Sequence, residues 1–208
     1  MSWSRASHLN WALYFLRVSS MEDLDRYIIE ATRVRRAIVV YSEMFGTTES
    51  VRVLNKSAGE AFSIIQRAMH DEIVISLSRL FDSRGYEHRG EVLEYLSQYN
   101  IVSKYEAHLN ERGKRLRRLT GKIINKLAFK PYRSLKIAHN DKALFLGHTP
   151  KIKHNITSYR VLLLIDLSIS IMVSIKASVL NTSTVSLPVN LSNKYVGIGS
   201  SVVNRLKI

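Results

Sequence analysis

An arginine and a histidine six positions apart are the residues of this chain best suited to catalysis. Arg133 and His139 lie in the stretch Tyr-Arg-Ser-Leu-Lys-Ile-Ala-His-Asn-Asp, residues 132–141. Histidine titrates in the range that proton transfer requires, and arginine offers a rigid fork of donors to phosphate oxygens. The pair therefore suits attack of a ribose 2′-hydroxyl on its neighbouring phosphate, a reaction that needs proton transfer and a cation beside the phosphorus but no metal ion.

The spacing of this pair is compatible with a second interpretation. A continuous helix would place the two side chains ~120° apart around its axis. The same residues would then be ordinary polar groups on a solvated helix. The sequence around the pair provides further evidence on which interpretation holds.

Most of the positive charge of the chain lies near this pair. The chain has 31 basic and 17 acidic residues and a net charge of +14, and residues 101–160 contain 15 of the basic residues and 3 of the acidic ones. A solvated helix face is the simpler explanation of a charged stretch, but alternating signs are typical of such a face, and this stretch has one sign. We expect it to bind an anion such as an RNA backbone. The candidate phosphate contacts are Lys114, Arg115, Arg117, Arg118 and Lys136.

The composition excludes several other kinds of chemistry. The chain has no cysteine, which excludes disulfide bonds, thiol catalysis and cysteine-ligated zinc. Its glycines have neither the Walker nor the dinucleotide-binding spacing, and its histidines form no metal-ligand pattern. We therefore expect no cofactor and no metal.

The spacing of apolar residues predicts an all-α protein. Apolar residues recur every three or four positions, and prolines and glycines are few. A break is expected at residues 82–85, and further breaks at Gly113 and Gly121. The helices predicted within a bundle with a four-helix core cover residues 20–45, 48–80, 91–98, 101–127, a segment beginning at Pro131, and 156–181.

Three parts of the chain are expected. Residues 1–19 would form an N-terminal helix or docking segment, residues 20–181 the helical domain, and residues 182–208 a loop-rich tail whose further structure, short strands included, stays open. The apolar run 161–180 is near the length of a membrane span but contains Asp166 and Lys176. We expect it to be a buried helix of a cytoplasmic protein with no membrane span.

Two stretches together resemble a known family. Residues 132–141 have five residues between the arginine and the histidine and end in Ile-Ala-His-Asn-Asp, and residues 70–82 end in Ser-Arg-Leu-Phe-Asp. Both stretches, and the order of the helices, resemble the abortive-infection U-type (AbiU-like) branch of the HEPN superfamily. The likeness covers roughly residues 20–180. The spacing of Arg79 and Asp82 is also that of an ordinary ion pair at a helix end.

The resemblance implies a homodimer in which two copies of the arginine–histidine motif face one cleft. It implies a metal-independent ribonuclease that acts as a toxin or in phage defence and leaves 2′,3′-cyclic phosphate ends. Arg133 would then hold the scissile phosphate, and His139 would transfer a proton or hold the hydroxyl. Ser134 stands where active members often have Asn, Asp or His. The supporting residues would be Ser134, Asn140, Asp141, Asp71 and Arg79.

Two other functions fit the same residues. A non-catalytic HEPN domain would bind nucleic acid or nucleotides, or would serve as a subunit of a defence complex, and a cognate antitoxin is a further expected partner. Membrane-surface binding through the basic face and the segment with Trp3 and Trp11 is the third alternative.

Overall fold

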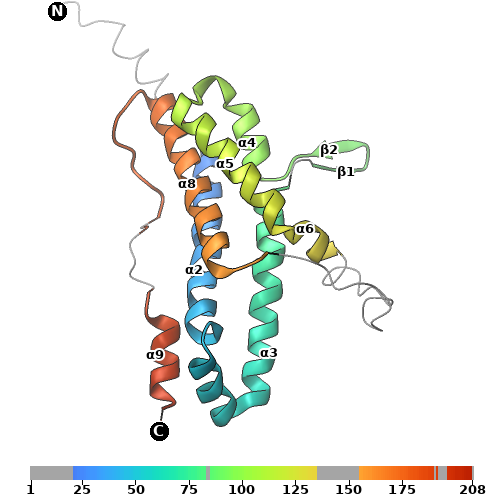
Figure 1. The fold of residues 1–208 in the computed structure, drawn as a ribbon. Helices are drawn as coiled ribbons and strands as arrows, with labels where there is room; N and C mark the ends of the chain where they lie inside the picture. Colours follow the sequence, from blue (N-terminus) through green and yellow to red (C-terminus); the bar gives the residue numbers. More distant parts are fainter. Residues whose placement is uncertain (1–20, 83–84, 135–154, 190, 192–195, 208) are drawn as a thin grey trace, which may run out of the picture.

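Long helices form the frame of the molecule (Figure 1). The structure is a computed structural model and describes residues 21–82, 85–134, 155–189, 191 and 196–207. The prediction of an all-α protein is confirmed, because the regular structure within these residues is helical apart from one two-stranded hairpin. The elements are α2 (Glu22–Phe45), α3 (Thr48–Leu80), β1 (Tyr86–His88), β2 (Glu91–Leu93), α4 (Gln98–Lys104), a 3-10 turn (Glu106–His108), α5 (Glu111–Leu127), α6 (Phe129–Tyr132), α8 (Ser158–Leu180) and α9 (Ile198–Arg205).

Local capping residues set where several helices begin. Each cap is a polar side chain that accepts a hydrogen bond from the backbone N–H three residues later, as N-cap residues do. The caps of α3, α4, α5 and α8 are Thr47, Ser97, Asn110 and Thr157. The starts of these helices are therefore encoded by short-range sequence.

Helix α8 packs against both α2 and α5. It is long and apolar enough to cross a membrane, with a mean hydropathy of 1.9, and half of its most apolar window is buried in this structure. The two charged residues within its apolar run have partners on α2: Asp166 lies 2.7 Å from Nε of Arg35, and Nζ of Lys176 lies 2.6 Å from Asp25. Helix α8 therefore joins the bundle through ion pairs as well as apolar contacts.

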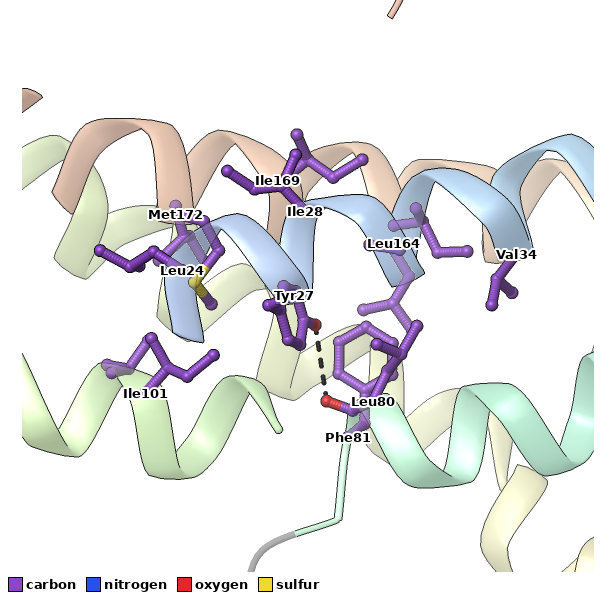
Figure 2. Close-up of a cluster of buried hydrophobic side chains, with 14 of the residues drawn as sticks. Leu24, Tyr27, Ile28, Val34, Leu80, Phe81, Ile101, Leu164, Ile169 and Met172 are labelled. Atoms are coloured by element: carbon purple, nitrogen blue, oxygen red, sulfur yellow. Dashed lines mark hydrogen bonds between the residues drawn. The ribbon is translucent and has the colours of Figure 1, made fainter. Parts of the chain in front are cut away.

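A buried polar cluster around Tyr27 lies within the apolar core, and Figure 2 shows its hydrogen bond to Leu80. The Tyr27 hydroxyl donates to the carbonyl oxygen of Leu80 at 3.4 Å and lies 2.6 Å from Oγ of Ser168. Burial raises the pKa of this phenol. The cluster fastens α2 to the end of α3 and to α8.

The helix predicted at residues 91–98 is wrong, because a β-hairpin and a loop occupy this region. Arg89 and Gly90 both have positive φ, at 53° and 83°, which suits the two-residue turn between Tyr86–His88 and Glu91–Leu93. An added Cβ at Gly85 would collide with the carbonyl oxygen of Leu93. The hairpin projects from the bundle (Figure 1).

The helix predicted over residues 101–127 is two helices with a 3-10 turn between them. The break falls between Lys104 and Glu111, and neither Gly113 nor Gly121 interrupts α5. Gly113 instead allows close contact, since an added Cβ would lie 2.6 Å from a methyl group of Leu109.

Helix α6 begins at Phe129, two residues before the predicted start at Pro131. Ala128 ends α5 in the left-handed conformation with a φ of 52°. Pro131 consequently lies in the first turn of α6, where its missing N–H costs little.

The tail contains a helix that the sequence did not predict. Glu43 of α2 accepts hydrogen bonds from the backbone N–H groups of Gly197, Gly199 and Ser200, at 2.7, 2.8 and 3.3 Å. These groups lie at the start of α9, where a carboxylate is favoured by the helix dipole. Residues 198–205 are therefore a helix within the expected loop-rich tail, and the helix expected within residues 1–19 lies outside the described residues.

Candidate active site

The two stretches that carry the family resemblance meet at the carboxylate of Asp82. Nη1 of Arg133, the residue directly after α6, lies 3.5 Å from one oxygen of Asp82. Nζ of Lys130, which is on α6, lies 3.2 Å from the other oxygen. About a third of each cationic side chain and a quarter of the carboxylate remain exposed. One acidic side chain thus holds two cations together at the surface.

The expected local pair between Arg79 and Asp82 is absent from the described residues. The preference of Asp82 for Lys130 and Arg133 is a long-range effect, because α6 is packed against α3. Asp82 is therefore a site residue, and the helical spacing that suggested Arg79 as its partner was misleading. Its place at the end of the Ser-Arg-Leu-Phe-Asp stretch was the signal that could have revealed it.

Asp71 is connected to α6 through a histidine. Nδ1 of His70 lies 3.0 Å from the Asp71 carboxylate, and the His70 ring meets the buried ring of Tyr132 edge-on, with 5.6 Å between centroids. Tyr132 directly precedes Arg133. Asp71 and His70 thus support the helix turn that presents the arginine, and His70 is a supporting residue that was not predicted.

Arg79 belongs to a different cluster. It shares a row of α3 with Glu72 and Ser76, and Arg33 of α2 bonds to both of these residues at 3.0 Å. The hydrogen bond from Ser76 is the main cause that lowers the pKa of Glu72, with Arg33 and the charge of Arg79 acting in the same direction. Arg79 and Arg33 line a separate cavity of about 330 Å³. The structure does not bring Arg79 to Arg133.

Four of the five predicted phosphate contacts lie along α5, and one residue separates α5 from α6. Lys114, Arg115 and Arg118 are exposed, and Arg117 is half-buried. Lys114 pairs with Glu111 at 2.8 Å, and Arg117 with Glu106 at 3.4 Å. Among the described residues, Arg115 and Arg118 form no ion pair. The helix therefore offers an exposed basic surface next to the Asp82 cluster.

The remaining predicted site residues are Ser134 and four residues further along the chain. Ser134 is half-buried and follows Arg133 directly. In the part of the chain that the structure describes, no group of three or more His, Cys, Asp or Glu residues could hold a metal ion. Lys136, His139, Asn140 and Asp141 lie outside the described residues.

The fold and this arrangement define the class of the protein. A helical bundle with a motif arginine after α6, fastened to the end of the long helix α3, fits a HEPN-type helical domain. A family model described as AbiU2, a HEPN family, matches residues 21–190. The chain therefore belongs to the AbiU2 family, which confirms the predicted resemblance. The searches of the curated proteins and of the solved structures found no match.

Proposed function

We propose that this HEPN-type abortive-infection protein is a metal-independent endoribonuclease. One observation carries the proposal: Arg133 and Lys130 converge on the carboxylate of Asp82 at the end of the basic helix α5. A phosphodiester has the same charge as this carboxylate and similarly spaced oxygens. RNA phosphate would therefore compete with Asp82 for both cations.

The proposed reaction is transfer of a phosphodiester to the neighbouring 2′-hydroxyl. The hydroxyl loses its proton, its oxygen attacks phosphorus, and the 5′-oxygen leaves with a proton, which yields a 2′,3′-cyclic phosphate and a 5′-hydroxyl. Arg133 would stabilise the charge that develops on the phosphate oxygens. His139 would transfer a proton, and Ser134 would hydrogen-bond the phosphate.

The active unit would be a homodimer whose two motifs share one cleft. This assembly requires that neither copy cleaves alone. Sedimentation of the purified protein, compared with cleavage rates over the same concentrations, tests the requirement. Cleavage at full specific activity by a monomer would contradict it.

The function is tested by incubating labelled RNA with the protein in EDTA. Arg133→Ala and His139→Ala should each abolish cleavage. The matched controls are Arg52→Ala, which removes an exposed arginine paired with Glu49, and His88→Ala on the hairpin. Both controls should cleave like the wild type. Cleavage that survives in Arg133→Ala, or that disappears in EDTA, would refute the proposed mechanism.

The second candidate is a non-catalytic subunit that binds nucleic acid. Two observations favour it: Asp82 already neutralises Arg133, and Ser134 follows the motif arginine. Such a protein would bind RNA without cleaving it. Its binding would be insensitive to His139→Ala.

A further inference from the structure

A small cavity lies beside the Asp82 cluster, between α4 and α5. Its volume is about 260 Å³, below the ~300–1,000 Å³ that drug-sized ligands occupy, so it suits a single ring system. Lys130, the partner of Asp82, lies on its wall. The cavity is therefore adjacent to the place proposed for the scissile phosphate.

Gln98, one of the residues that line this cavity, has a buried amide oxygen without a hydrogen-bond partner in the described part of the chain. Its side-chain Nε2 donates to Oγ1 of Thr120 at 3.0 Å, and the Thr120 hydroxyl donates to the carbonyl oxygen of Arg117 at 2.8 Å. Because the hydroxyl proton is engaged, Oγ1 can only accept from Gln98, which fixes the orientation of the amide.

The remaining amide oxygen, Oε1 of Gln98, has no hydrogen-bond partner within the described residues. The residue is only 7% exposed, and a buried acceptor without a donor is costly. Because Gln98 lies on the cavity wall, a ligand N–H group that reaches this oxygen from the cavity would satisfy it.

The other walls select a flat ligand that carries a phosphate. Phe81 is a buried aromatic side chain, and the ring of Tyr99 is half-exposed. Arg117 and Lys130 add positive charge to the same walls. Aromatic rings, a fixed acceptor and cations together suit an unpaired nucleobase joined to its phosphodiester.

We propose that this cavity binds one unpaired base of the RNA next to the scissile phosphate, with the ring of Tyr99 stacked on it and Oε1 of Gln98 accepting from its edge. The proposal rests on the proposed function only in taking RNA as the ligand. It identifies the recognised feature as a flipped-out base rather than the backbone alone.

Gly121 allows the cavity to be filled without disturbing the bundle. It lies on the cavity wall, and an added Cβ would meet no atom within 4 Å. Gly121→Leu should therefore fold and occupy the space of the base, and its melting temperature should equal or exceed that of the wild type. The matched control is Gly59→Leu on α3, where an added Cβ makes only ordinary contact with Asn55.

The test is binding of a short 2′-O-methyl RNA, which lacks the hydroxyl needed for cleavage, and of copies with a single abasic position moved along the strand. One abasic position should weaken wild-type binding by about 5- to 150-fold, the range for loss of one stacked base. Gly121→Leu and Tyr99→Ala should weaken binding of the intact strand similarly, and the abasic position should then have no further effect. Tyr99→Phe and Gly59→Leu should bind like the wild type.

Two results would overturn the base site: wild-type affinity in Gly121→Leu, or equal losses at every abasic position in both proteins. Absence of cleavage with the predicted binding pattern would refute the ribonuclease proposal alone. Normal cleavage with unchanged binding in Gly121→Leu would refute the base site alone.

Discussion

Replacing Asp82 with asparagine removes one negative charge and keeps the shape of the side chain. In the wild type this carboxylate lies 3.2 Å from Nζ of Lys130 and 3.5 Å from Nη1 of Arg133. Both pairs are partly exposed, so their loss should lower the free energy of unfolding by only about 1 kcal/mol. The variant should stay folded with two cations that no carboxylate neutralises.

The expected effect on RNA binding follows from counterion release. Each phosphate contact on a single strand changes the slope of log K against log salt concentration by about −0.7. If Lys130 and Arg133 both contact phosphate more fully in Asp82→Asn, the slope should steepen by about 1.4. Over a fourfold change in salt, this amounts to roughly a sevenfold larger loss of affinity than in the wild type.

The assay is fluorescence anisotropy of a labelled 2′-O-methyl RNA over a series of salt concentrations. Asp166→Asn is the matched control, because it removes the same charge from an ion pair with Arg35 on the α2–α8 face. Its slope should equal that of the wild type. If Asp82→Asn also has the wild-type slope, Lys130 and Arg133 do not contact phosphate and the argument for the site fails.

Two further predictions concern stability. Burial raises the pKa of Tyr27, so just above the ordinary tyrosine pKa near 10 only the unfolded chain ionises this phenol. The contribution of Tyr27 to the free energy of unfolding is therefore complete below about pH 10. Above that pH it falls by about 1.4 kcal/mol per pH unit. Tyr27→Phe should cost about 1 kcal/mol at neutral pH and remove this slope, as measured by urea unfolding at several pH values; equal slopes would contradict the assignment. Glu43→Gln should weaken the packing of α9 on α2 by about 1–2 kcal/mol. Backbone hydrogen exchange should then be about 5- to 30-fold faster in α9 alone. Equal exchange rates in the variant and the wild type would show that the carboxylate does not hold α9 in place.

The long helices could be predicted because their information is local. In α2 and α3 the apolar residues repeat at the helical period, and α8 is one long apolar run. Thr47 and Thr157 cap the starts of α3 and α8. The helix predicted at residues 91–98 failed because Val92, Leu93 and Leu96 also fit a helical face. The positive φ angles of Arg89 and Gly90 decide for a hairpin instead.

Helix α9 depends on contacts that the sequence does not display. Its start is stabilised by Glu43, more than 150 positions earlier in the chain. An added Cβ at Gly199 would lie 2.7 Å from the carbonyl oxygen of Val40, so this glycine permits close packing of α9 on α2. Neither interaction follows from local propensity.

The candidate site was predicted in part for the same reason. Motif resemblance identified Arg133 and the stretch ending in Asp82, and the structure brings these two residues together. The structure places Arg79 near Arg33 and Glu72 instead. Arg79 and Asp82 are close in the sequence, but their side chains lie on different faces of the molecule. Gln98 and Tyr99 were not predicted as site residues, because residues that line a cavity share no recognisable sequence motif.

The single residue between α5 and α6 has a consequence for insertions and deletions. Ala128 alone joins Leu127, the last residue of α5, to Phe129, the first residue of α6. One residue added within α6 before Lys130 would rotate the following side chains by about 100° and advance them by about 1.5 Å. Lys130 and Arg133 would then turn away from Asp82, whereas an insertion in the projecting hairpin would leave their register unchanged.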